Sequence, residues 1–398
     1  MKKSPVIIGA ALIVLLHSCQ PYQDAPAENQ YLAGVHQTVD LNIDELYDSF
    51  GVEDYPEITS KLEYIITCRS FRAVVITYHT TDPAGNPVVA DGTLYYPLDR
   101  DIKGVVEMSG IAHMNKNGGS SEDIPVLEAL PVLAGYAVVL PDMIGYGKYG
   151  NTKEMFHPFM MIDNLGKTAW DMRQAAIEFF AGLGYRVPRK TVISGYSYGG
   201  GVGLAVARYY QEHHFQEVSV DRVIVGGGAY DLNATFDGFA KNPICIYPLL
   251  PGIIMSLDHY YGLELDYSQI FRGPLVDHYQ QWYDRTRNAS GLIALISEDM
   301  RNYMHPDFFK PREDRNAEFQ KIQPVLDMNS AVDGWVPRMP IYIFHSTEDL
   351  YVPVEAAEYA YQTFKKNGAY VQYQSGPGTH ADWGVKAFAP LLLYLAVE

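Results

Sequence analysis

Short apolar runs rich in β-branched residues recur along the chain, and longer amphipathic stretches separate them. A continuous apolar run of this length is typical of a strand that is buried on both faces, as in a parallel sheet. Residues 165–184 carry apolar side chains at every third or fourth position, which predicts a helix, and residues 199–213 and 354–366 also read as helices. Strands that alternate with helices predict an α/β fold, in which helices cover both faces of an open, mostly parallel sheet. The strand candidates are residues 105–108, 137–140, 191–193, 223–225 and 341–344.

Two β-rich runs precede this alternating region. Residues 73–78 and 88–96 flank the sequence DPAGN at residues 82–86, which is favourable turn chemistry, so a β-hairpin is expected there. A short helix is expected over residues 41–47, and a last strand over residues 370–374.

The alternation stops between residues 234 and 335. This stretch contains proline at seven positions and short helical pieces such as residues 291–300. A stretch of this length is not expected to be structureless inside a compact domain. We therefore expect a helical cap over residues 234–335, inserted into an α/β core that is formed by residues 41–233 and 336–398.

The N-terminus has the pattern of a targeting segment. Two lysines precede an apolar run over residues 6–16, which is too short to span a bilayer at ~20 residues per helix but suits the core of a signal peptide. The sequence LHSC at residues 16–19 resembles a bacterial lipobox. It predicts a signal peptide over residues 1–18, a lipid anchor on Cys19 and a cell-envelope location, followed by a polar tether over residues 19–40. The alternative is ordinary secretory cleavage, which would give a soluble secreted or periplasmic protein.

Charge and cysteine content narrow the possible partners. The formal net charge of −17 repels phosphate backbones, so nucleic-acid binding is not expected. Apart from Cys19, the only cysteines are Cys68 and Cys245, which an exported protein could pair or keep as free thiols. The sequence does not indicate an oligomeric state.

No cofactor or metal motif is complete. Residues 166–168 read GKT and end like a phosphate-binding loop, but Met161 stands where that motif needs its first glycine. There is no H-E-x-x-H sequence. We therefore expect neither a cofactor nor a metal.

The strongest chemical signal is the sequence GYSYG at residues 195–199. It matches G-x-S-x-G and lies directly after a predicted strand and before a predicted helix, the context in which a serine nucleophile sits on a sharp turn. Ser197 is therefore the candidate nucleophile, and the positive end of the following helix would face a developing oxyanion. The alternative is a glycine-rich packing turn without function.

A serine nucleophile needs a base, and the base needs an orienting acid. Asp349 follows the strand at residues 341–344, and Glu348 is its rival for the role of acid. His380 follows the last predicted strand in a glycine-rich loop and is the only histidine beyond Asp349. Ser197, Asp349 and His380 are therefore the candidate catalytic triad.

Two further sets of residues are candidates for binding. The oxyanion hole should use the backbone N–H of Tyr198 and a second N–H from Gly110 or Ile111, in the loop after the strand at residues 105–108. Within the predicted cap, aromatic side chains are candidates for substrate contact, with cap packing as the alternative. These are Tyr260, Tyr261, Tyr279, Trp282 and Tyr283.

Several segments together resemble the α/β-hydrolase superfamily, and within it the secreted lipase and esterase branch of fungi and bacteria. The resemblance rests on LAGYAVVLPDMIGYG at residues 133–147, HPF at residues 157–159, the serine turn, and the run from Asn329 through WVP and PIYIFH to DLYVP at residues 349–353. It covers roughly residues 100–398. It implies the same Ser, Asp and His triad, although this chain has Ser109-Gly110 where many relatives have His-Gly.

These observations predict a carboxylesterase or lipase that cleaves a small-molecule ester through an acyl-enzyme. A serine peptidase of the same fold is the first alternative. The second is a non-catalytic envelope lipoprotein on a hydrolase scaffold.

Overall fold

The computed structural model describes the whole chain except residues 1–20, 27, 46–65 and 126. The predicted signal peptide and Cys19 lie outside the described residues. None of the helices in the described part is long and apolar enough to cross a membrane.

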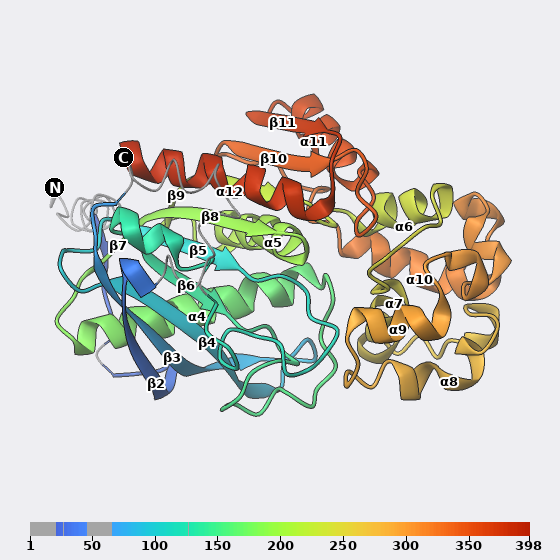
Figure 1. Cartoon of the computed structure of the whole chain (residues 1–398), viewed down its shortest axis with the longest axis horizontal. Helices are drawn as coiled ribbons and strands as arrows, with labels where there is room; N and C mark the ends of the chain where they lie inside the picture. Colours follow the sequence, from blue (N-terminus) through green and yellow to red (C-terminus); the bar gives the residue numbers. More distant parts are fainter. Residues whose placement is uncertain (1–20, 27, 46–65, 126) are drawn as a thin grey trace, which may run out of the picture.

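A nine-stranded sheet forms the centre of the molecule (Figure 1). Its strand order is β11-β10-β9-β8-β5-β6-β4-β3-β2, and the first six strands in this order are parallel. These strands are β5 (Val105–Ser109), β6 (Ala137–Pro141), β8 (Lys190–Tyr196), β9 (Ser219–Gly226), β10 (Ile341–Ser346) and β11 (Val371–Gly376). The runs of β-branched residues are therefore the buried parallel strands that the sequence predicts.

Antiparallel strands complete the other side of the sheet. Strands β3 (Ser70–Thr81) and β4 (Pro87–Pro97) pair from end to end, which confirms the predicted hairpin. Strand β2 (Leu32–Asn42) adds to β3 at the sheet edge. The short helix expected over residues 41–47 is only partly described: Leu41 and Asn42 end β2, residues 43–45 are helical, and the rest lies outside the described residues.

Helices cover both faces of the sheet, so the predicted fold class is confirmed. Successive residues of a strand point to opposite faces. In β8, Val192 packs in a cluster with helix α12 (His380–Val397), whereas Ile193 packs in a cluster with helix α5 (Tyr198–His213). Helix α4 (Ile162–Gly182) lies beside α5 and packs on β3 and β6.

The stretch between β9 and β10, all of which is described, contains helices and no strand. Figure 1 shows these helices gathered at one end of the molecule, beyond the sheet. Their apolar side chains continue the core cluster of the α5 face. The helices are α6 (Leu232–Lys241), α7 (Leu250–Tyr261), α8 (Leu275–Trp282), α9 (Ala289–Ile296) and α10 (Ala317–Met328), joined by the short turns η3 (Tyr267–Gln269), η4 (Met300–Asn302), η5 (Pro306–Phe309) and η6 (Arg312–Asp314). Helix α11 (Glu355–Lys366) follows β10 and packs against α6.

The described part of the predicted tether is folded, which differs from the prediction. Strand β1 (Tyr22–Gln23) pairs antiparallel with β7 (Val187–Pro188), and the Arg189 N–H donates to the Pro21 carbonyl at 2.9 Å. The Glu178 carboxylate accepts backbone N–H bonds from residues 30–32. These long-range partners satisfy backbone hydrogen-bonding groups of a segment whose composition is typical of a linker, and so give it regular structure. We call residues 21–23 the N-terminal strap.

Cys68 and Cys245 are both free and buried. They belong to different core clusters, and Cys245 lies in the helical segment between α6 and α7.

Candidate active site

Ser197 lies on a strained turn between β8 and α5. Its backbone has φ 60° and ψ −129°, an unfavourable conformation for a residue with a side chain. The turn is so tight that a Cβ on Gly195 would lie 2.1 Å from the Gly199 carbonyl oxygen, and one on Gly199 would lie 2.2 Å from the Ser109 oxygen. The Ser197 N–H donates to the Gly226 carbonyl at 2.9 Å, which ties the turn to the end of β9. The two flanking glycines therefore allow a geometry that leaves Ser197 partly exposed at the carboxyl edge of the sheet.

Asp349 and His380 meet at the same edge. His380 Nδ1 lies 2.5 Å from Asp349 Oδ2, and the Asp349 side chain is fully buried. The other oxygen, Oδ1, accepts the backbone N–H groups of Tyr351 at 2.8 Å and Val352 at 3.0 Å. A carboxylate that accepts this many bonds is stabilised in its charged form.

A second histidine, to which sequence reasoning gave no role, also faces this carboxylate. His345, at the end of β10, is fully buried, and its Nε2 lies 3.4 Å from Asp349 Oδ2 and 3.0 Å from the Val352 carbonyl oxygen. Burial raises the pKa of Asp349, but the hydrogen bonds from His345 and His380 outweigh burial and place the pKa below its ordinary value. The ionised form of Asp349 is therefore favoured over the protonated form.

His380 is the first residue of α12, not a loop residue as the glycine-rich sequence predicts. Thr379 caps this helix in a capping box with Asp382, so the helix starts directly at the histidine. The Tyr196 hydroxyl donates to the His380 carbonyl at 2.5 Å and fixes this backbone from the strand that leads to Ser197. His380 Nε2 is buried and has no hydrogen-bond partner among the described residues.

Ser197 and His380 converge on the end of β9. A Cβ on Gly227 would lie 3.0 Å from His380 Cε1, and the preceding residue, Gly226, accepts the Ser197 N–H. Within the described chain, no hydrogen bond joins the Ser197 hydroxyl to His380. The structure thus brings Asp349 and His380 into direct contact, and places Ser197 at the same strand end.

Glu348, the rival acid, has a different partner. Its Oε2 accepts the Gly378 N–H at 3.0 Å, so it braces the loop that leads to His380. That geometry gives Glu348 a structural contact with the histidine loop, whereas Asp349 touches the imidazole itself.

The candidate oxyanion residues line one cavity of about 530 Å³. Gly110, Ile111 and Tyr198 all contribute to it, and Ile111 is 50% exposed. The far wall is held by Asp142, whose carboxylate accepts the N–H of Ser120 at 2.5 Å and of Ser121 at 3.0 Å. The structure therefore brings the three predicted residues to one cavity. Tyr198 directly follows Ser197 in the chain, but Ser197, Asp349 and His380 are not among the residues that line this cavity.

The aromatic residues that sequence reasoning selected between β9 and β10 make contacts within that segment or with the adjoining core. Tyr283 is buried, and its hydroxyl donates to the Pro248 carbonyl at 2.8 Å. Tyr279 stacks on Tyr267 with ring centroids 4.2 Å apart. Trp282 lines a small cavity of about 40 Å³.

The two remaining candidates make polar contacts. Tyr260 donates to the Phe156 carbonyl at 2.6 Å, and the Tyr261 hydroxyl accepts from Asn329 at 2.9 Å. Such contacts are those of side chains that pack the segment and fix its position against the core.

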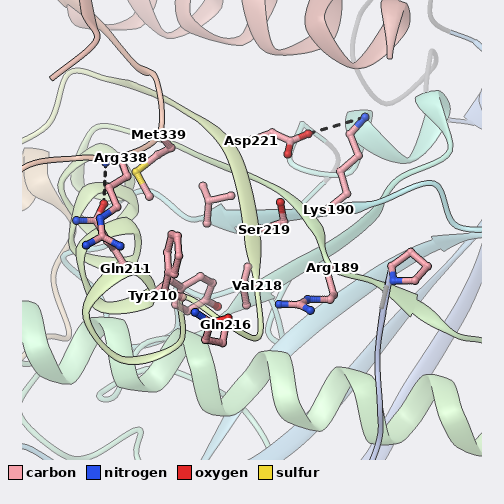
Figure 2. Close-up of a pocket in the computed structure, with 13 residues that line it drawn as sticks. Arg189, Lys190, Tyr210, Gln211, Gln216, Val218, Ser219, Asp221, Arg338 and Met339 are labelled. Atoms are coloured by element: carbon pink, nitrogen blue, oxygen red, sulfur yellow. Dashed lines mark hydrogen bonds and ion pairs between the residues drawn. The ribbon is translucent and has the colours of Figure 1, made fainter. Parts of the chain in front are cut away.

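Another hollow, of about 620 Å³, lies at the opposite edge of the sheet, where β8 and β9 begin. Figure 2 shows the polar side chains of Lys190, Asp221, Gln211 and Arg338 around it. None of the candidate triad, all of which is described, belongs to its lining. In open α/β sheets ligands bind at the carboxyl edge, so size alone does not make this hollow the reaction site.

No group of three or more His, Cys, Asp or Glu side chains in the described ranges is arranged to hold a metal ion.

Comparison with known proteins identifies the family. The sequence profile of the secretory lipase family matches residues 120–379. Because this is more than half of the chain, the protein belongs to the secretory lipase family. No curated protein matches the sequence significantly.

Solved structures share the fold. A protein of proposed hydrolase activity from Legionella pneumophila is 18% identical, with a TM-score of 0.76 over 92% of this chain and 97% of that one. The rice cell wall degrading esterase LipA from Xanthomonas oryzae is 20% identical, with a TM-score of 0.73 over 94% of this chain and 97% of that one. Lipase A of Candida antarctica in its closed state is 15% identical, with a TM-score of 0.60 over 96% of this chain and 86% of that one.

Fold and family together define the class. The chain is an α/β-hydrolase of the lipase and carboxylesterase type.

Proposed function

We propose that this protein hydrolyses carboxylic esters through an acyl-enzyme, with Ser197 as nucleophile, His380 as base and Asp349 as orienting acid. The observation that carries the proposal is the 2.5 Å contact between His380 Nδ1 and Asp349 Oδ2, close to a serine on a strained turn. If His380 Nδ1 donates its proton to the ionised Asp349, the other ring nitrogen, Nε2, has a free lone pair. That nitrogen can take the Ser197 proton as the serine oxygen attacks the ester carbonyl.

The tetrahedral oxyanion would be held by backbone N–H groups. Tyr198 is the first residue of α5, where N–H groups have no partner inside the helix and the helix dipole is positive. A second N–H would come from Gly110 or Ile111, which line the same cavity as Tyr198, the residue after Ser197. Collapse of the intermediate releases the alcohol, which takes its proton from His380, and water then attacks the acyl-enzyme with His380 again as base.

A fluorophosphonate probe tests this assignment directly. We expect it to label the wild-type chain at Ser197, as shown by mass spectrometry of the labelled peptide, and to leave Ser197→Ala unlabelled. Labelling at another residue would refute Ser197 as the nucleophile, and no labelling at all would favour a non-catalytic protein. Comparing matched ester and peptide-amide substrates separates an esterase from a peptidase.

We also propose that residues 234–335 act as a cap over the site. Tyr247 supports this, because it belongs to that segment and its hydroxyl donates to the Ala112 carbonyl at 2.8 Å, in the same loop as Gly110 and Ile111. A cap limits the length of a bound acyl chain and excludes water. We therefore expect short and medium aryl esters to be preferred.

The proposed location is the cell envelope, with a lipid on Cys19. The family name, secretory lipase, agrees with export. Wild-type protein should fractionate with membranes, and Cys19→Ser should abolish lipidation, as measured by radiolabelled fatty acid incorporation. A wholly soluble wild-type protein would instead indicate ordinary secretory cleavage.

A further inference from the structure

Aromatic rings from two other elements surround the imidazole of His380. The Tyr351 ring lies flat on it, with ring centroids 4.6 Å apart and planes 6° apart. The Tyr196 ring contacts it at 4.9 Å with a tilt of 49°. A flat stack restricts rotation of the imidazole about its last side-chain bond, so Tyr351 constrains the ring plane while Asp349 holds one nitrogen.

A third ring extends this stack into the helical segment. Tyr247, between α6 and α7, stacks on Tyr351 with centroids 5.4 Å apart and planes 19° apart. A backbone bond reinforces the contact, because the Ile246 N–H donates to the Leu350 carbonyl at 3.1 Å. Residues 246–247 therefore hold the loop that carries Asp349 and Tyr351.

Tyr247 also reaches the other side of the site. Its hydroxyl donates to the Ala112 carbonyl at 2.8 Å, two residues beyond Gly110. Its own backbone is fixed within the helical segment, because the preceding Cys245 is buried, donates its N–H to the Glu298 carbonyl at 2.8 Å and donates its thiol to the Tyr247 carbonyl at 3.2 Å.

Tyr247 thus contacts both the loop that carries Asp349 and Tyr351, here called the acid loop, and the loop that carries Gly110 and Ile111, here called the oxyanion loop. We propose that Tyr247 and Tyr351 are positioning residues, which set the plane of the His380 imidazole and the place of the oxyanion loop together. The inference rests on the proposed function, because it assigns His380 as the base. By this proposal, residues 245–247 must be packed in place for His380 to activate Ser197. The position of the cap and the activation of the nucleophile are then coupled.

Variants of Tyr247 and Tyr351 should misalign the catalytic groups without weakening the binding of substrate. Small misplacements of a catalytic group can cost ~10²-fold in rate. Tyr351→Leu removes the ring that lies on the imidazole, and we expect kcat to fall by about 10- to 100-fold with little change in KM. Tyr351→Phe keeps the ring and should recover most of that loss. Tyr247→Phe keeps the stack but loses the bond to Ala112, so a smaller fall of a few-fold up to about tenfold is expected.

Fluorophosphonate labelling distinguishes positioning from a general folding defect. In a positioning variant every molecule still reacts, so the final extent of labelling at Ser197 stays complete while the rate constant falls. In a partly misfolded variant the extent falls and the remaining molecules react at the wild-type rate. Tyr361→Leu is the matched control, because it deletes a ring from another aromatic pair, with Tyr373 on β11 at 5.4 Å, outside the site. It should keep the wild-type rate constant.

The outcomes separate the two proposals. Slow but complete labelling of Tyr351→Leu and Tyr247→Phe, with rescue by Tyr351→Phe, supports the inference. Wild-type labelling rate constants in both variants would overturn the inference and leave the proposed function standing. A fall in the extent of labelling with an unchanged rate constant would have the same meaning. No labelling of the wild-type chain at Ser197 overturns the proposed function and the inference with it.

Discussion

The carboxyl edge of the parallel strands and the helical segment between β9 and β10 use their polar side chains differently. At the edge, ionisable side chains face one another: Asp349 Oδ2 lies 2.5 Å from His380 and 3.4 Å from His345. In the helical segment, tyrosine hydroxyls donate mainly to backbone carbonyls, as Tyr283 does to Pro248 and Tyr260 does to Phe156. Pairs of the first kind can move protons, whereas bonds of the second kind fix the path of the chain. The two regions should therefore respond differently to mutation.

The largest effects are expected for the nucleophile and base. Ser197→Ala and His380→Ala should each lower kcat by roughly 10⁴-fold or more, and the double variant should be little worse, because these residues act as a unit. Steady-state kinetics on an aryl ester measures this. Losses that multiply in the double variant would contradict the assignment.

The acid comes next. Asp349→Asn should lower kcat by roughly 10³- to 10⁴-fold, because an amide does not favour the tautomer with the proton on Nδ1. Glu348→Gln keeps an oxygen that can accept the Gly378 N–H and should be mild. This pair is a matched test, since the residues are adjacent and lose the same charge. A severe Glu348→Gln and a mild Asp349→Asn would exchange their roles.

The stability of the folded protein is expected to fall at acid pH because of His157, which lies where the two regions meet. His157 is buried, its carbonyl accepts the Ser256 hydroxyl of α7, and burial lowers the pKa of its imidazole to about 3. In the unfolded chain an ordinary histidine has a pKa near ~6.5, so between these values only the unfolded state binds the proton. Stability contributed by neutral His157 is therefore present above pH ~6.5 and falls by about 1.4 kcal/mol per pH unit on acidification towards pH 3.

Urea unfolding at several pH values measures this slope. His157→Gln cannot acquire charge and should have a shallower dependence of unfolding free energy on pH, whatever its absolute stability. An unchanged slope would mean that other groups cause the acid sensitivity.

The smallest effect is expected in the helical segment. Trp282→Ala enlarges the small cavity that Trp282 lines and should change the ratio of kcat/KM between short and long acyl chains by a few-fold, more than it changes stability. A chain-length series of aryl esters measures the ratio. If the ratio is unaffected, Trp282 has a packing role only and the cap does not select chain length through it.

The sequence predicted those parts of the fold that depend on local pattern. Strands β5, β6, β8, β9 and β10, the hairpin, and helices α4, α5 and α11 follow from apolar periodicity and turn residues. The serine turn was recognisable because its tight geometry requires glycine at positions 195 and 199, and these glycines are visible in the sequence.

Contacts between distant residues were not predictable in this way. The stack of Tyr247, Tyr351 and His380 joins three segments separated by long stretches of chain, and no local pattern marks it. His345 reads as one more strand residue, although it is fully buried beside Asp349. Strand β1 has two residues, too few for a periodic signal. In β2 the apolar Val35 is exposed whereas the polar Gln37 is half-buried, so the hydrophobic pattern of residues 32–42 does not mark the strand.

The N-terminal strap has a consequence for how the molecule is oriented. The Pro21 carbonyl accepts a hydrogen bond from the N–H of Arg189, which directly precedes β8, and Ser197 follows the other end of that strand. The seven residues of β8 span about 20 Å, whereas residues 19 and 20 together can reach only ~7 Å. Pro21 is therefore fixed at the amino edge of the sheet, at the end of β8 opposite to Ser197. If Cys19 carries the proposed lipid, the membrane would lie on the side of this amino edge, and Ser197 would lie at the opposite edge of the sheet.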